Sequence, residues 1–217
     1  MTIRPRTVLV ALFGIAASVL LLPGRSLAGD AAVDGLAPGT AAPSFVLPVV
    51  NDYAVKRWGP GKWTGSDAET PKKLVILSFF ATYCDPCKKE MPELVRLWEK
   101  YESQGLGILL VSIDKGQDQR DEVVALAKQN GVLFPVVHDR FQVVARRYGA
   151  ERLPYMLMLG ADGVVKRVHI GYTDELKAAL ENEVRAELGL EPLPNEVASV
   201  KGKAPSKSKS KSKRGRK

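Results

Sequence analysis

The order of apolar and polar positions along the chain alternates between two patterns. Residues 74–81 and 107–114 are short runs of almost continuous apolar character, which is typical of strands buried on both faces of a sheet. From Cys84 to Gly105, apolar side chains instead recur three and four residues apart and predict an amphipathic helix. The chain therefore contains a strand, a helix and a second strand in succession.

Further segments continue this alternation as far as residue 189. Helical spacing marks residues 119–131, 141–149 and 173–189, and the last of these helices has Thr173 or Asp174 as its N-cap. Strand-like runs mark residues 44–50, 55–58, 134–139 and 155–171, the last run being two strands joined at Ala161-Asp162-Gly163. We predict an α/β fold in which a mixed central sheet is flanked by helices and preceded by an N-terminal strand extension.

The chain begins with a segment that is typical of export signals. Arg4 and Arg6 precede an uncharged apolar run, and Ser26 and Ala28 have the small-x-small spacing of a cleavage site. We interpret residues 1–28 as a signal peptide cut after Ala28. The alternative is a retained anchor, for which the apolar run is short, since a spanning helix needs about 20 residues. Both interpretations predict export to the periplasm or cell envelope, where disulfides persist.

Composition and charge separate a folded body from the two ends of the chain. Residues 29–43 are small and rich in Pro and Gly, and predict a flexible leader before a domain at 44–190. The net charge is +8, but 3 of the 32 basic residues lie in 1–28 and 9 lie in 201–217, which leaves 20 basic against 24 acidic residues, or −4, in 29–200. The high isoelectric point therefore does not indicate a nucleic-acid-binding domain, and no specific nucleic-acid partner is expected.

The C-terminal segment, 191–217, ends in alternating lysine and serine. It offers little apolar surface to bury, so it cannot offset the entropy of ordering and is predicted to be a disordered basic tail. Two interpretations remain open: a solubilising extension, or a segment that contacts an anionic membrane surface, where each basic residue contributes about 1 kcal/mol.

The chain has two cysteines, Cys84 and Cys87, and several uses of such a pair can be weighed. A structural staple across a loop of about 4 residues adds roughly 2 kcal/mol, against about 4–5 for a loop near 100 residues. A zinc-type site needs about four ligands, and only His138 and His169 are available as histidine partners. Covalent haem attachment needs His directly after the second cysteine, where this chain has Lys88. Reversible dithiol chemistry is the hypothesis that remains.

The predicted position of the pair at a strand–helix junction supports this hypothesis. Cys84 opens the helix, so its sulfur is expected to face unpaired N–H groups and the positive end of the helix dipole, which favour the thiolate. Cys87 lies one turn further in and can close on a mixed disulfide to release the partner. Pro86 suits the first helical turn, where a missing N–H is no loss.

The segment "LVILSFFATYCDPCKKEMPEL" resembles the active-site strand and helix of thioredoxin-fold proteins, specifically the exported TlpA/ResA-like thiol-disulfide oxidoreductases. The resemblance extends over about residues 41–190 and implies that the 44–190 domain is thioredoxin-like. It also implies a Cys84–Cys87 disulfide and a cis Leu153–Pro154 bond that presents backbone beside Cys84 to an extended substrate. Tyr83, where Trp is usual, would keep an aromatic lid for the substrate.

Two further features of the motif bear on its proton and redox chemistry. Many cytoplasmic thioredoxins carry a buried Asp where this chain has Ser78, whereas Glu90 matches an active-site glutamate of ResA-like proteins. Glu90 lies three residues after Cys87, on the same helical face, and could accept and return its proton. The alternative is a solvent-facing glutamate that pairs along the helix.

Three residues between and beside the sulfurs are expected to tune the redox poise: Asp85, Pro86 and Lys88. The negative charge of Asp85 disfavours the thiolate and makes the couple more reducing, whereas Lys88 acts in the opposite direction.

The leading hypothesis is an exported thiol-disulfide oxidoreductase that reduces disulfides of cell-envelope proteins, using an upstream electron donor and no cofactor or metal. The resemblance implies a role in cytochrome c maturation or metal-site assembly. Two alternatives are a thiol peroxidase, which would need Pro and Thr where this chain has Leu77 and Ala81, and a copper-delivery or metal-binding module.

Overall fold

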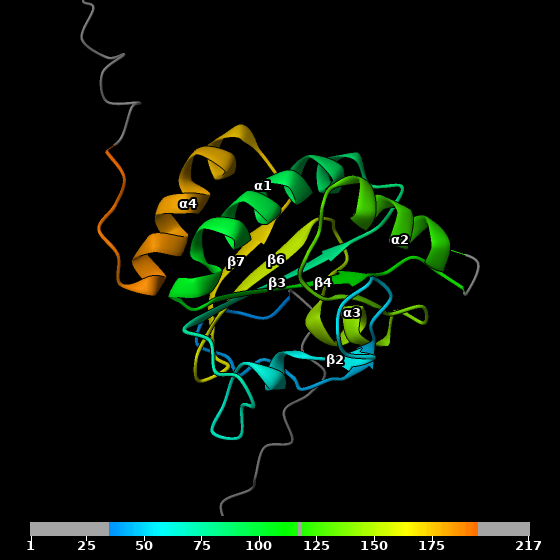
Figure 1. The fold of residues 1–217 in the computed structure, drawn as a ribbon, viewed down its shortest axis with the longest axis horizontal. Coiled ribbons are helices and arrows are strands. Elements are labelled where there is room, and N and C mark those ends of the chain that lie inside the picture. The colour runs from blue at the N-terminus through cyan, green and yellow to red at the C-terminus, as the bar shows by residue number, and fades with distance from the viewer. Residues whose placement is uncertain (1–34, 117–118, 195–217) are drawn as a thin grey trace, which may run out of the picture. The chain divides into compact units, whose positions relative to one another are not determined.

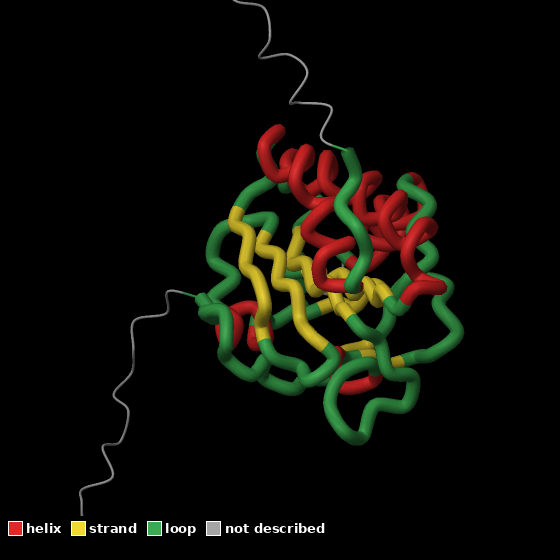
Figure 2. The backbone as a smooth tube through the Cα atoms, turned by 90° about the vertical axis from the view of Figure 1, so that its left-hand side faces the viewer, coloured by secondary structure: helices red, strands yellow, loops and turns green. Residues whose placement is uncertain are grey.

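The computed structural model describes residues 35–116 and 119–194. Within these residues the main sheet has five strands in the order β5-β4-β3-β6-β7. They are β3 (Leu74–Phe80), β4 (Leu106–Ser112), β5 (Val136–His138), β6 (Tyr155–Gly160) and β7 (Val165–Ile170). The first three run parallel to one another, while β6 and β7 are antiparallel to their neighbours. The predicted mixed sheet is therefore confirmed, and Figure 2 shows its strands side by side with helices packed against them.

The helices are α1 (Asp85–Tyr101), α2 (Arg120–Gln129), α3 (Val143–Tyr148) and α4 (Asp174–Leu188), with short 3-10 turns at Pro60–Lys62 and Glu102–Gln104. Helices α1 and α4 contact each other and lie side by side in Figure 1. Since successive side chains of a strand point to opposite faces, β3 shows which helix covers each face. Ser78 bonds to Glu90 of α1, whereas Phe79 packs on Tyr148 of α3, so α1 and α3 lie on opposite faces of the sheet.

The central strands are buried along their whole length, as the continuous apolar runs predicted. All residues of β3 and β4 are buried, and the two strands pair in parallel from Leu74 with Leu106 to Phe80 with Ser112. The predicted helix ends are also close to the observed ones. Thr173, and not Asp174, is the N-cap of α4, because its side chain accepts a hydrogen bond from the Leu176 N–H at 3.2 Å.

The strands of the N-terminal extension are shorter than the sequence predicted. Strand β1 covers only Leu47–Pro48 and pairs with β2, Arg57–Trp58, in a separate two-stranded sheet. The next residues turn to the edge of the main sheet, where the Val50 N–H donates to the Val136 carbonyl at 2.8 Å. The 44–50 run therefore divides between two sheets instead of forming one strand.

The segment before the domain is attached to the sheet where the structure describes it. The Gly39 N–H donates to the Val165 carbonyl at 2.8 Å, and the Ala42 N–H donates to the Gly163 carbonyl at 3.0 Å. The described part of the 29–43 segment thus differs from the flexible leader that composition suggested. The predicted signal peptide, 1–28, and the Lys/Ser-rich tail from residue 195 onward lie outside the described residues. Among the helices that are described, none has the length and apolar character needed to cross a membrane.

Candidate functional site

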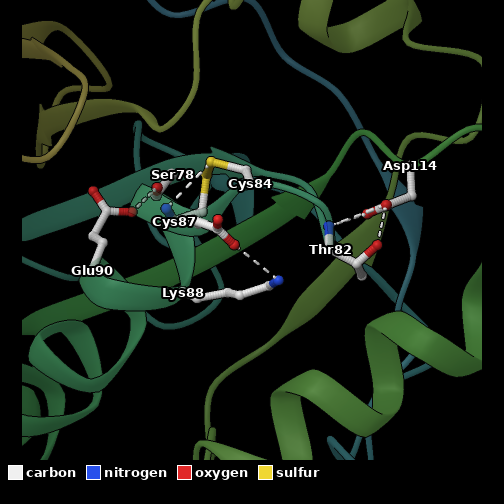
Figure 3. The surroundings of a disulfide bond; sticks show 8 residues. Ser78, Thr82, Cys84, Cys87, Lys88, Glu90 and Asp114 are labelled. Atoms are coloured by element: carbon white, nitrogen blue, oxygen red, sulfur yellow. Dashed lines mark hydrogen bonds and ion pairs between the residues drawn. A yellow bond between two sulfur atoms is a disulfide. The ribbon is translucent and has the colours of Figure 1, made fainter.

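The two cysteines lie where β3 ends and α1 begins. Cys84 is the N-cap of α1, and its Sγ is bonded to Sγ of Cys87 in a disulfide (Figure 3). The Cys84 Sγ also accepts a hydrogen bond from the Cys87 N–H at 3.2 Å. Cys84 is 8% exposed and Cys87 is 1% exposed. An N-cap sulfur that faces backbone N–H groups is well placed to carry negative charge once the disulfide is reduced.

The loop before β6 lies beside this junction because of strand pairing. Tyr155, the first residue of β6, pairs with Phe79 near the end of β3, so the residues just before Tyr155 lie next to the segment that leads to Cys84. The Leu153–Pro154 bond is cis, as the resemblance implied. The Pro154 carbonyl accepts a hydrogen bond from the Gly171 N–H at 2.8 Å, which ties this loop to the turn before α4.

The side chains around the disulfide that were expected to bind substrate or tune the couple are mostly exposed. Tyr83 is 69% exposed directly before Cys84. Lys88 Nζ lies 3.3 Å from Asp85 Oδ1, with side-chain exposures of 43% and 84%. The roles predicted for these residues, and for Leu153, Pro154 and Pro86, remain predictions. Exposed ion pairs of this kind contribute only about 0–1 kcal/mol.

Glu90 is buried, 1% exposed, and does not face solvent. The alternative of a surface glutamate that pairs along the helix is therefore wrong. The Ser78 hydroxyl donates to Glu90 Oε2 at 2.8 Å, while Oε1 is buried and has no hydrogen-bond partner among the described residues (Figure 3). Burial raises the pKa of the Glu90 carboxyl to about 7, although the Ser78 hydrogen bond acts in the opposite direction. Near neutral pH this group can therefore exist in both protonation states.

Tyr172 is one neighbour of this acid that pattern analysis did not identify. It lies in the loop between β7 and α4, and its hydroxyl is buried without a partner among the described residues. Burial, together with the negative charges of Glu93 and Glu90, raises the Tyr172 pKa to about 12. No local signal marks this residue, since it meets α1 only through the packing of the α4 loop.

The buried Asp114 and the half-buried Thr82 form a second polar cluster that pattern analysis also missed. Asp114 is 1% exposed. Its carboxylate accepts hydrogen bonds from the Thr82 N–H at 3.1 Å and from the Thr82 hydroxyl at 2.6 Å (Figure 3). It also accepts a hydrogen bond from the Ser112 hydroxyl at 2.8 Å. The sequence does contain a signal for this cluster, since a polar residue follows each of two buried strands. The carboxyl ends of parallel strands meet at one edge of a sheet, so these two residues could have been expected to lie close together.

The two histidines are engaged elsewhere. His138 Nε2 donates to the backbone carbonyl of Asp114 at 2.7 Å, since a carbonyl oxygen can only accept. His169 Nε2 lies 2.8 Å from Glu183 Oε2 of α4. In the part of the chain that the structure describes, no group of three or more His, Cys, Asp or Glu side chains is arranged to hold a metal ion.

Comparison with known proteins agrees with this geometry. Residues 38–168 match the model of the AhpC/TSA family. The chain is 32% identical to the thiol-disulfide oxidoreductase ResA of Geobacillus thermodenitrificans over 68% of this chain and 78% of that protein. It is 30% identical to the Bacillus subtilis ResA over 65% of this chain and 72% of that protein.

A solved structure gives the same result in three dimensions. A protein assigned as the thiol:disulfide interchange protein DsbE of Chlorobium tepidum superposes with a TM-score of 0.61 and 27% identity, covering 71% of this chain and 99% of that one. The buried strand, the N-cap cysteine and the cis proline loop occur together in a mixed sheet flanked by helices. The chain therefore belongs to the AhpC/TSA family, among the ResA-like thiol-disulfide oxidoreductases with a thioredoxin-like fold.

Proposed function

We propose that this protein reduces disulfides of other proteins in the cell envelope through the Cys84-Asp85-Pro86-Cys87 dithiol. The observation that carries the proposal is the asymmetry of the pair. Cys84 is the N-cap of α1 and the more exposed of the two cysteines, whereas Cys87 is almost fully enclosed one turn further into the helix. Such an arrangement suits one attacking and one resolving sulfur.

The exchange proceeds in two steps. The Cys84 thiolate attacks one sulfur of a partner disulfide, so a mixed disulfide forms and the other partner sulfur leaves as a thiolate that takes up a proton. The Cys87 thiolate then attacks Cys84 Sγ, which breaks the mixed disulfide and releases the second partner thiol. Two electrons pass from the dithiol to the partner. An upstream thiol donor returns two electrons and two protons, and thereby restores Cys84 and Cys87.

Glu90 is the proposed acceptor of the Cys87 proton in the second step. Both residues are buried, lie on one face of α1 and are separated by a single helical turn. A carboxyl whose pKa is about 7 matches the pH at which such an acid takes up and returns a proton most readily. Ser78, which stands where many relatives in the fold carry an acid, orients Glu90 through its hydroxyl.

Substrate contact is assigned to the exposed Tyr83 and to the backbone of the Leu153–Pro154 loop, in which Leu153 is half-buried and Pro154 is buried. Tyr83 exposes its ring beside Cys84, and the Leu153–Pro154 loop adjoins the same junction through the pairing of β6 with β3. An extended partner segment that lies along this loop would bring its disulfide to Cys84.

The expected leader sequence supports a cellular setting outside the cytoplasm. We assign the protein to the periplasm or cell envelope, with disulfide-bearing envelope proteins as substrates and a role in cytochrome c maturation or metal-site assembly.

The basic tail is proposed to add contact with an anionic membrane surface. Removing residues 201–217 should leave insulin reduction intact and weaken binding to anionic vesicles at low salt, whereas loss of activity would contradict a tail that is independent of the catalytic body.

The decisive experiment traps the substrates. Cys87→Ala should accumulate mixed disulfides between Cys84 and envelope proteins, because the resolving thiol is missing, and mass spectrometry would identify these partners. Cys84→Ala/Cys87→Ala is the matched control and should trap none. Mixed disulfides formed by Cys84→Ala through Cys87 would reverse the roles, and equal alkylation rates of the two reduced thiols would do the same.

The direction of electron flow is tested by the reduction potential. A reductant is expected to lie nearer thioredoxin, at about −270 mV, than the oxidant DsbA, at about −120 mV. A glutathione titration that placed this couple near the DsbA value would make the protein a disulfide donor.

A further inference from the structure

The turn that presents Cys84 is held by residues outside the dithiol motif. The Cys84 N–H donates to the Ala81 carbonyl at 3.1 Å, which closes a four-residue turn with Thr82 and Tyr83 at its corners. Tyr83 is exposed. The orientation of the turn therefore depends on what holds Thr82.

Strand register places Asp114 against Thr82. Phe80 pairs with Ser112, and the Ile113 N–H donates to the Phe80 carbonyl at 2.9 Å. Continued by two residues, the same register brings Thr82 opposite Asp114. Both carboxylate oxygens of Asp114 lie 3.1 Å from the Thr82 nitrogen, and Oδ1 also accepts from the Thr82 hydroxyl at 2.6 Å.

Asp114 is itself fixed by Ser112 of β4, the strand that it follows, and by His138 of the neighbouring strand, β5. Its N–H donates to the Ser112 hydroxyl at 3.2 Å, and that hydroxyl donates to Asp114 Oδ2 at 2.8 Å. Its backbone carbonyl accepts from His138 at the end of β5. The carboxylate therefore has a defined position before it meets Thr82, and a buried network in which all members are bonded is rigid.

We propose that Asp114 is a positioning residue for the reaction, which acts through Thr82 to hold the Ala81–Cys84 turn and so aim the Cys84 sulfur. This inference rests on the proposed role of Cys84 as the attacking thiol. Figure 3 shows the chain of contacts, in which Asp114 reaches the backbone two residues before Cys84 and touches neither sulfur.

Two effects of Asp114 on Cys84 have opposite signs, and this makes the proposal testable. As a negative charge, Asp114 disfavours the thiolate, so its removal would lower the Cys84 pKa and speed attack at neutral pH. As a clamp, it keeps Cys84 at the helix N-terminus and aligned for attack, so its removal would slow the reaction even when all Cys84 is thiolate.

The experiment measures reduced protein reacting with oxidised glutathione from pH 5 to 10, together with the Cys84 pKa from thiolate absorbance. The variants are Asp114→Asn, Thr82→Val, the double variant, and Thr82→Ser, which keeps the hydroxyl. Asp139→Asn is the matched control, because Asp139 is also buried but bonds to the N–H groups of Val143 and Ala145 at the start of α3.

We expect Asp114→Asn and Thr82→Val each to lower the limiting rate at high pH by about fivefold to tenfold. The double variant should be no slower than the slower single variant, since both weaken the same set of hydrogen bonds between Asp114 and Thr82. Thr82→Ser and Asp139→Asn should keep the wild-type rate.

Three results would overturn the proposal. A faster Asp114→Asn with an unchanged Thr82→Val would show an effect of charge alone. Unchanged rates in folded protein with only lower thermal stability would show a structural role, and additive losses would show two independent contacts. If wild-type Cys84 itself failed to react with oxidised glutathione, the proposed function would fail, independently of the positioning role.

Discussion

Glu90 and Asp114 are two buried acids that flank the same strand–helix junction, and each is 1% exposed. Their surroundings differ in the number of hydrogen-bond donors. Glu90 accepts one hydrogen bond, from Ser78, and its second oxygen has no partner among the described residues. Both oxygens of Asp114 are bonded, to the N–H and hydroxyl of Thr82 and to the hydroxyl of Ser112.

The difference shows that burial alone does not define what a carboxyl does. A buried carboxylate with few donors is costly, so the proton is retained to higher pH and the group becomes a proton carrier near neutrality. A carboxylate surrounded by donors is instead a fixed anchor for the backbone that supplies them. The strand–helix junction therefore contains one acid of each kind, Glu90 as the proton carrier and Asp114 as the anchor.

Apolar replacement of the two acids should give the largest effects, in opposite directions. Asp114→Leu leaves the two Thr82 donors and the Ser112 hydroxyl unpaired, and is expected to lower the free energy of unfolding by on the order of 4 kcal/mol. Glu90→Met removes an acid that is poorly solvated as an anion, and should raise stability at pH 8. Urea unfolding measures both changes. An equal loss of unfolding free energy in the two variants would show that the two acids do not differ in this way.

The pH dependence of stability should follow from Glu90. Its pKa is raised from 4.5 to about 7 on folding, so the native state binds the extra proton and the stabilisation is complete below about pH 4.5. It is lost as the pH rises through about 7, an effect on the order of 3 kcal/mol. Glu90→Gln should remove this slope in urea unfolding between pH 5 and 8. Glu99→Gln, on the exposed face of the same helix, should keep it.

Removing the Ser78 hydroxyl, which donates to Glu90, should increase the difference between the two acids. The expected change in stability is smaller than that from removing Glu90 itself. Ser78→Ala deletes the hydrogen bond that opposes the rise in the Glu90 pKa, so the titration midpoint should move further above 7, with a stability loss of about 1 kcal/mol at pH 8. The carboxyl carbon shift in NMR would report the midpoint. Ser112→Ala, an equally buried serine on the next strand that serves Asp114, should leave that midpoint unchanged.

The smallest effect is expected from the exposed charges beside the sulfurs. Asp85→Asn should stabilise the thiolate and make the couple less reducing, whereas Lys88→Gln should make it more reducing. Because the pair is solvent-exposed, each shift in potential should stay below about 20 mV and shrink with added salt. If Asp85→Asn or Lys88→Gln shifted the reduction potential more than Glu90→Gln does, the exposed charges, and not the buried acid, would control that potential.

Much of the fold could be predicted because it depends on local pattern. The apolar run 74–81 is β3, the spacing after Cys84 is α1, and the cis Leu153–Pro154 loop occupies the position implied by the resemblance. The 44–50 run was less predictable, since pairing with β2 and then with the edge of β5 divides a segment that is uniform in pattern. Pairing at a sheet edge depends on which strand packs there in the folded protein. The sequence of a short segment does not contain this information.

The sequence by itself determined the dithiol and its position at a helix start, because spacing and helix geometry act within a few residues. The resemblance to ResA-like proteins indicated Glu90 as the candidate acid, and helix spacing placed it on the face of Cys87. Only the tertiary structure decided what each buried acid meets. Ser78 reaches Glu90 across the β3–α1 interface, and Asp114 reaches Thr82 across two paired strands. The Ser112 donor to Asp114 is local, but the Ser78 and Thr82 donors come from other elements. Packing, and not local pattern, therefore makes one acid a proton carrier and the other an anchor.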